Sequence, residues 1–199
     1  MHDLSLNILD IVENSINAKA TRVDISIEEN IKEDKLCITV ADNGVGMDSQ
    51  LSSSIIDPFT TTRTCRKVGL GLPLLRIEAK QCHGELSIDS RPGEGTTVKV
   101  VFQYGHIDRP PLGDIASTLI CIISANPGLN IVYQHRVENV CYRLDTGEIK
   151  KVGGECCLKE KGTFAVLSQD IEKGFSSLAR QRKKVFKQVF GYSPRIDLV

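Results

Sequence analysis

The chain has 199 residues, 41% of them hydrophobic and 25% charged, and its 25 basic and 25 acidic side chains leave a formal net charge of zero. This length can bury a core, as one large domain or two small ones, and the balanced charge excludes a global electrostatic attraction to nucleic acid or membranes. No apolar run is long enough to span a bilayer, and the acidic N-terminal stretch lacks the basic start of a signal peptide. We therefore expect a cytoplasmic protein that contacts no membrane and for which nucleic acid is an unlikely partner.

The seven cysteines do not predict a disulfide framework or a zinc site. Their number is odd and no C-x-x-C pair is present, whereas disulfide-rich domains and zinc sites show paired, regular spacings. Cys37, Cys121 and Cys141 lie in apolar runs, and we expect them to be small core residues. The adjacent pair Cys156–Cys157 fits either a structural or a redox role, and the sequence leaves its role open.

The first hundred residues predict alternating helices and strands. Apolar residues at helical spacing predict a helix over 4–18, and alternating apolar residues predict strands at 21–30 and 35–42. The remaining predicted elements are a short helix at 47–56, a loop at 57–72, a helix at 73–82, and strands at 84–90 and 96–103. This order predicts an α+β fold, a two-layer sandwich in which helices cover one face of a sheet.

A boundary is predicted at 104–114, where two prolines and two glycines interrupt the pattern. We expect a first domain at 1–105 and a second, smaller α+β domain at 106–199. Its predicted elements are a helix at 113–126, strands at 129–137 and 139–145, and a helix at 168–186, with a loop region after residue 145 that contains a short strand at 162–168. No motif in this part indicates its role.

Polar residues lie at two positions that suit ligand binding. Asp10 and Asn14 are four residues apart on the first predicted helix, so both project from one face. Asp42, Gly44 and Gly46 directly follow a predicted strand. An Asp-Asn-Gly sequence alone also fits a plain hairpin turn, so this motif needs support from the rest of the chain.

That support comes from a glycine-containing loop before the third helix. Gly69 and Gly71 stand where the loop enters the helix, which allows backbone N–H groups to approach an anion at the helix N-terminus. The stretch TTTR at 60–63 adds hydroxyls and a guanidinium. Each feature alone is weak, but their order within a hundred residues favours a nucleotide with Mg²⁺.

Five motifs in 3–103 together resemble the GHKL, or Bergerat-fold, ATP-binding domain of gyrase, heat-shock chaperones, histidine kinases and MutL-type repair proteins. DIVENSINAKATRVDISI resembles the N box, most closely its MutL form, and DNGVGM resembles the G1 box. DPFTTTR and VGLGLPLL resemble the F and G2 boxes of histidine kinases, and HGELSIDSRPGEGTTVKVVF resembles the closing strands with the G3 turn. The resemblance implies the histidine kinase-like ATPase fold for this part of the chain.

The resemblance implies an adenine site at the G1 box. Asp42 would accept a hydrogen bond from the adenine amino group, and Thr96 would lie nearby. Gly44 and Gly46 would let the backbone turn under the base, and Met47 would pack on it.

It also implies a phosphate site between the N box and the G2 box. Asn14 would bind Mg²⁺ through its side-chain oxygen, which suits a hard cation. Thr62 and Arg63 would close over the phosphates as a lid. The backbone N–H groups facing the phosphates would be those of Gly69, Leu70, Gly71 and Leu72.

One departure from the family pattern leaves hydrolysis open. MutL-type members carry Glu four residues before the metal-binding Asn, as general base for water, and this chain has Asp10 there. Asp is one methylene shorter, and a displacement of about 1 Å can cost roughly a hundredfold in rate. Glu13 is an alternative base, or a solvated surface carboxylate. We therefore expect ATP binding with slow or no hydrolysis by the isolated chain.

A second departure concerns the phosphoryl acceptor. Histidine kinases carry a helical hairpin with an acceptor histidine before this domain, and too few residues precede the N box here. His2 lies too near the nucleotide helix to accept in cis, His83 is interpreted as structural, and His106 and His135 as surface residues. We expect a separate protein partner, phosphorylated on histidine or serine. The alternatives are a nucleotide sensor without turnover and a weak MutL-like ATPase, and a homodimer is also open.

The last helix carries one basic run, RQRKK at 180–184. We interpret it as a solvated helix face near a C-terminus, where the helix dipole favours cations, rather than a nucleic-acid contact.

Overall fold

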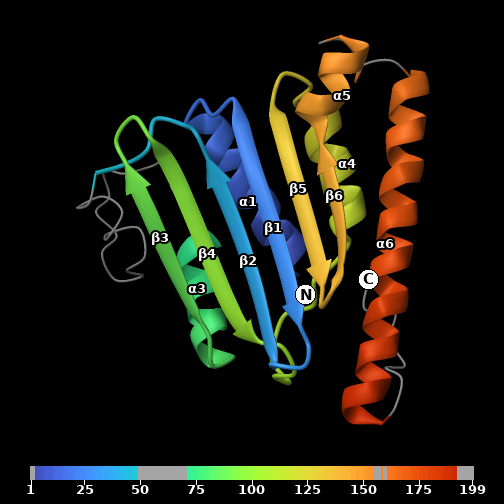
Figure 1. The fold of residues 1–199 in the computed structure, drawn as a ribbon. Coiled ribbons are helices and arrows are strands. Elements are labelled where there is room, and N and C mark those ends of the chain that lie inside the picture. The colour runs from blue at the N-terminus through green and yellow to red at the C-terminus, as the bar shows by residue number, and fades with distance from the viewer. Residues whose placement is uncertain (1–2, 49–70, 155–157, 159–160, 192–199) are drawn as a thin grey trace.

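The computed structural model describes residues 3–48, 71–154, 158 and 161–191. A single six-stranded sheet in the order β3-β4-β2-β1-β5-β6 forms its centre (Figure 1). All neighbouring strands are antiparallel except β1 and β5, which run parallel. The strands are β1 (Arg22–Asn30), β2 (Lys35–Asp42), β3 (Glu85–Arg91), β4 (Gly95–Gln103), β5 (Asn130–Val137) and β6 (Val140–Asp145). The helices are α1 (Leu4–Asn17), α3 (Gly71–Gln81), α4 (Ile115–Ala125), α5 (Thr146–Gly153) and α6 (Lys161–Phe190).

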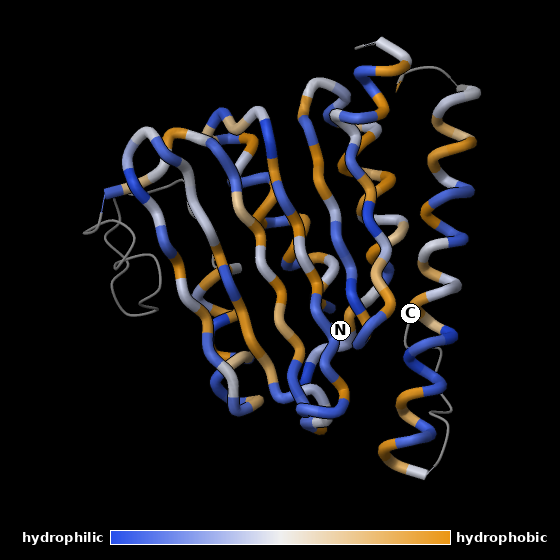
Figure 2. The backbone as a smooth tube through the Cα atoms, viewed as in Figure 1, coloured by the Kyte–Doolittle hydropathy of each residue, from blue (hydrophilic) through white to orange (hydrophobic). Residues whose placement is uncertain are grey.

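Helices pack against one face of this sheet, as the sequence predicts. In β1, Val23, Ile25 and Ile27 are buried, while the residues between them are partly exposed. Hydrophobic and polar positions alternate along the strands in the same way (Figure 2). Because successive side chains of a strand point to opposite faces, this alternation defines one covered face and one open face. Helices α1, α3 and α4 lie behind the sheet in Figure 1, so the predicted two-layer α+β fold is confirmed.

The strands from the second half of the chain extend this same sheet. β5 pairs with β1 over the whole length of both strands, from Arg22–Asn130 to Glu29–Val137. The free edge of β1 would otherwise leave a row of backbone donors and acceptors unpaired. The segment 106–199 is α+β in content, as predicted, but its strands do not build a sheet of their own. A domain boundary at residue 105 stays a prediction.

The prediction of a short strand at 162–168 is wrong. These residues belong to α6, which begins at Lys161. Leu167, Ile171 and Leu178 are buried on one helical stripe, and packing of that stripe outweighs the β propensity of the run Thr-Phe-Ala-Val. Helix α5 replaces part of the predicted loop. The short helix predicted at 47–56 and the loop at 57–72 lie largely outside the described residues.

The cysteine prediction is also partly wrong. Cys121 and Cys141 are exposed, and Cys37 is partly buried. Cys121 lies on α4, whose buried side consists of Ile115, Leu119, Ile122 and Ile123. Because apolar residues lie on all sides of this helix, the sequence does not show which side faces the core, and only packing decides which residues are buried.

Candidate functional site

Asp42 is the last residue of β2, and two short hydrogen bonds hold its carboxylate. Its Oδ1 accepts from the backbone N–H of Gly44 at 2.8 Å, and its Oδ2 accepts from the Ser15 hydroxyl on α1 at 2.8 Å. The β2–β4 register makes Asp42 the direct partner of Thr96. An ionised carboxylate has about four acceptor positions, so Asp42 retains capacity for a further donor.

The turn after Asp42 needs glycine at two positions for different reasons. Gly46 has a φ of 65°, and a Cβ there would lie 2.0 Å from the Arg91 carbonyl oxygen. A Cβ at Gly44 would lie 2.7 Å from the Ala18 carbonyl oxygen. The backbone of this turn therefore packs tightly against both the end of α1 and the β3–β4 turn.

A cavity of about 330 Å³ lies under this turn, between α1 and the ends of β2, β3 and β4. Asp42, Met47 and Thr96 line it together with Asn14 and Leu72. Its size falls at the lower end of the range for small-molecule sites, and its apolar wall with few polar groups is typical of them. The residues expected around adenine are thus brought together.

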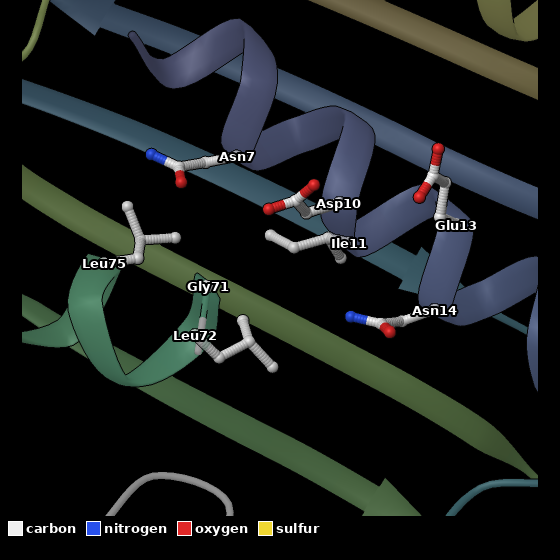
Figure 3. Close-up of a pocket in the computed structure, with 8 residues that line it drawn as sticks. All are labelled: Asn7, Asp10, Ile11, Glu13, Asn14, Gly71, Leu72 and Leu75. Atoms are coloured by element: carbon white, nitrogen blue, oxygen red, sulfur yellow. The ribbon is translucent and has the colours of Figure 1, made fainter. Parts of the chain in front are cut away.

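A second cavity of about 220 Å³ lies between α1 and the start of α3. Asp10 and Asn14 line it, and both extend toward the side on which α3 lies, whereas Glu13 points in a different direction (Figure 3). A Cβ added at Gly71 would lie 3.0 Å from the Asp10 Oδ2, so the glycine leaves room for the carboxylate over the first turn of α3. Asn14 and Leu72 line both cavities, which therefore adjoin.

Of the residues expected at the phosphates, Asn14, Gly71 and Leu72 are placed together by the structure. Gly71 and Leu72 are the first two residues of α3, and a helix N-terminus presents unpaired N–H groups to an anion. Thr62, Arg63, Gly69 and Leu70 lie outside the described residues.

A magnesium ion fits this cavity by the chemistry of its donors. Asp10 offers carboxylate oxygens and Asn14 an amide oxygen, which are ligands that Mg²⁺ prefers. Among the described residues, no group of three His, Cys, Asp or Glu side chains could hold a metal ion alone. The few oxygen donors of this cavity suit a cation that takes most of its ligands from phosphates and water.

Three residues that support the site were not anticipated. Ser15 donates to Asp42, and Ser90 accepts the Met47 N–H at 2.9 Å while lying 2.9 Å from the Thr96 hydroxyl. Asn43 Oδ1 accepts two backbone N–H groups at the start of β1. The position of Ser15 directly after Asn14 in a predicted helix was the one available sequence signal, and the other contacts depend on strand register.

His135 contradicts the expected surface position. It is 1% exposed, and its Nε2 lies 2.7 Å from Glu29 Oε1. Arg182, from the basic run expected to be solvated, is also buried and binds the same carboxylate. This buried cluster joins β1, β5 and α6, and it lines neither of the two cavities beside α1.

The geometry defines a site with two adjoining parts. One is the cavity that contains the Asp42 carboxylate at the end of β2, and the other is the polar cavity between α1 and the start of α3. Residues 2–106 match the family model described as "Histidine kinase-, DNA gyrase B-, and HSP90-like ATPase". The chain belongs to this family and carries a histidine kinase-like ATP-binding domain.

Several sensor kinases are similar to this chain over its first half. The histidine-protein kinase AtoS of Escherichia coli is 33% identical over 47% of this chain and 16% of the kinase. The sensor kinase FleS of Pseudomonas aeruginosa is 35% identical over 47% of this chain and 23% of the kinase. The sensor histidine kinase YxdK of Bacillus subtilis is 32% identical over 50% of this chain and 32% of the kinase. The matched segment thus spans less than a third of each of these relatives.

Two solved structures resemble the fold. The N-terminal domain of a DNA repair protein aligns over 73% of this chain and 52% of its own, with a TM-score of 0.50 and 16% identity. The catalytic domain of the histidine kinase ThkA aligns over 52% of this chain and 68% of its own, with a TM-score of 0.41 and 24% identity.

Among the described residues, no helix has the length and apolar character that crossing a membrane requires.

Proposed function

We propose that this chain binds ATP with Mg²⁺ and passes the terminal phosphoryl group to a separate protein, in the manner of a signalling kinase. The observation that carries the proposal is the pair of adjoining cavities. One contains Asp42 and Thr96, which suit an adenine, and the other contains Asn14 and Asp10 beside the start of α3, which suit the phosphates. A cytoplasmic location, where ATP is available, is part of this proposal.

Each end of the site has a distinct chemical task. Asp42 would accept from the base, and the N-terminus of α3 would face the negative phosphates. The Asn14 amide oxygen would hold Mg²⁺, which when bound supplies charge neutralisation at the phosphate oxygens. Asp10 would take the proton from the attacking hydroxyl, imidazole or water as the bond from the terminal phosphorus to the leaving ADP breaks.

The acceptor is proposed to come from another molecule. None of the described histidines, at 83, 106 and 135, lines either cavity. ATP labelled at the γ-phosphate, incubated with this chain, Mg²⁺ and the cell extract of its source, is expected to transfer label to a different protein. Failure of the purified chain to bind ADP in calorimetry, with or without metal, would rule the proposal out.

The Asp10 side chain is expected to control turnover but not binding. Asp10→Asn removes the base and should abolish any phosphate release, while ADP affinity changes by less than about twofold. Asp10→Glu restores a reach longer by one methylene and should retain binding and raise hydrolysis above the slow parent rate. Phosphate-release assays and calorimetry on the three proteins measure both effects.

Glu13→Gln is the matched control, because it removes one carboxylate from the same helix at an exposed position. It should leave phosphate release within about twofold of the parent, since Glu13 points away from Asp10 in Figure 3. If Asp10→Asn retains full turnover and Glu13→Gln loses it, the base has been assigned to the wrong residue.

Asn14→Ala is expected to remove the dependence of ATP affinity on Mg²⁺. The parent should bind ATP about tenfold more tightly with Mg²⁺ than with EDTA, and the variant should bind equally under both conditions. ADP affinity without metal should change little, because the contacts to the base remain. A parent whose ATP affinity is unaffected by EDTA would disprove this role for Asn14.

A further inference from the structure

Ser90 connects two parts of the proposed adenine site from a position outside the cavity. It is the last but one residue of β3, and the sheet register places it opposite Thr96 on β4, which in turn lies opposite Asp42 on β2. Because directly paired residues place their side chains on the same face of a sheet, the three form one polar row across neighbouring strands. Asp42 and Thr96 line the cavity of about 330 Å³ beside α1, and Ser90 does not.

The Ser90 hydroxyl makes three contacts, and together they use its full hydrogen-bonding capacity. Its Oγ accepts the Met47 backbone N–H at 2.9 Å and donates to the Gly95 carbonyl oxygen at 3.0 Å. It also lies 2.9 Å from the Thr96 Oγ1. A hydroxyl has one proton and two lone pairs. Since the carbonyl takes the proton and the Met47 N–H takes one lone pair, a single lone pair remains for Thr96.

This count fixes the direction of the hydrogen bond between the two hydroxyls. Thr96 donates its proton to Ser90, because the opposite direction would leave the Gly95 carbonyl oxygen facing a lone pair at 3.0 Å. With its proton directed at Ser90, the Thr96 oxygen has only lone pairs left for a ligand. The ionised carboxylate of Asp42 is likewise an acceptor alone. These two side chains therefore offer acceptors, and no donor, to a bound base.

We infer that Ser90 makes the site select a purine with an amino group at position 6, because it holds the Thr96 hydroxyl as an acceptor. An amino group has N–H donors for both acceptors, whereas the carbonyl oxygen of hypoxanthine at the same position would meet their lone pairs. The inference rests on the proposed ATP-binding function and adds a positioning residue to it, since Ser90 acts on the base through Thr96.

Calorimetry of ADP and IDP binding, each with Mg²⁺, tests this role in the full chain. The two nucleotides differ only in the base, which is adenine or hypoxanthine, so the ratio of their affinities isolates this end of the site. Ser90→Ala frees the Thr96 proton to turn toward the ligand and should lower the preference for ADP about fivefold. Ser90→Thr keeps a hydroxyl at this position and should retain the ratio of the parent.

A double variant separates this role from a purely structural one. Thr96→Val removes the hydroxyl from a side chain of nearly the same shape and should also lower the preference for ADP. In that background, Ser90→Ala should change the ratio by less than about twofold, because its effect passes through the missing hydroxyl. If Ser90→Ala instead weakens ADP and IDP equally, with or without the Thr96 hydroxyl, Ser90 only supports the turn at Met47 and the inference is overturned.

Ser87→Ala is the control, because it removes a hydroxyl from an exposed position on the same strand. It should leave both affinities unchanged. A preference for ADP that persists in Ser90→Ala overturns the role of Ser90 while nucleotide binding stands. A parent that binds neither nucleotide overturns the proposed function and this inference with it.

Discussion

Replacing Arg182 by alanine is expected to lower the free energy of unfolding by about 3–5 kcal/mol, because it leaves a buried carboxylate without its cationic partner. The carboxylate belongs to Glu29, whose side chain is fully buried in β1. Arg182 donates to it from Nε at 2.8 Å and also from Nη2. Urea denaturation of the parent and the variant measures the difference.

The remaining partners of Glu29 cannot compensate for this loss. Tyr104 donates its hydroxyl to Oε2 at 3.0 Å, and His135 Nε2 lies 2.7 Å from Oε1, with its other ring nitrogen 2.8 Å from the Tyr133 hydroxyl. The phenol is neutral, and Arg182 is the partner that carries a permanent charge. Removing both charges in the pair Glu29→Leu with Arg182→Met should therefore cost less than Arg182→Ala alone.

The stabilisation from this cluster depends on pH in a predictable direction. Burial alone would raise the pKa of Glu29, but hydrogen bonds from His135 and Arg182 outweigh it and hold the pKa far below its ordinary value of 4.5. A carboxyl whose pKa is lower in the folded state stabilises the fold at pH values above its unfolded pKa. The difference in stability between the parent and Arg182→Ala should thus be full near neutral pH and shrink as the pH falls below about 4.5.

Arg180→Ala provides the control on the same helix. Arg180 is exposed, and its guanidinium donates to the Ser176 carbonyl at 3.2 Å. Loss of such a surface contact should cost less than about 1 kcal/mol. Equal effects of the two arginine variants would contradict the buried pair.

The number of transitions in the same denaturation curves also tests the predicted boundary at residue 105, because a separate domain would unfold on its own.

Asp42→Asn is expected to weaken adenine nucleotide binding tenfold or more, on the order of 1.4 kcal/mol. The amide has one oxygen, and if it keeps the hydrogen bond from the Gly44 N–H, the NH₂ group takes the place of Oδ2. The Ser15 hydroxyl can turn away, because the Ile11 carbonyl lies 3.1 Å from it. The amino group of an adenine cannot turn away in this manner, so the NH₂ group of the new asparagine would face the amino group of the base, and two donors would meet.

Measurement with two bases separates this effect from a general loss of structure. The parent should prefer ADP to GDP, because a carboxylate attracts the adenine amino group and repels the guanine carbonyl, and Asp42→Asn should reduce that preference. Asp89→Asn makes the same change at an exposed position on β3 and should leave both affinities unchanged. If Asp42→Asn binds ADP as tightly as the parent, Asp42 does not accept a hydrogen bond from the adenine amino group.

The elements that the sequence predicted well are those with strong, local patterns. Strand β2 was predicted with its observed bounds, and α1 and β1 to within one residue at each end, because apolar periodicity follows directly from which face is buried. The pairing of Asp10 with Asn14 also needed nothing beyond helical spacing. Misreadings arose where a residue's burial depended on a distant segment, as in Cys121, His135 and the start of α6.

By itself, the sequence determined the family motifs and the α+β class, because both depend on residue patterns that are local in the chain, and the residues around the base and the phosphates stay a prediction. The tertiary structure alone decided that β5 and β6 extend the nucleotide-binding sheet, because parallel pairing of β1 with β5 joins residues more than a hundred positions apart. It also decided that Glu29, His135 and Arg182 form one buried cluster. No local pattern marks a charge for burial, because a buried charge is tolerated only where the fold supplies partners from elsewhere in the chain.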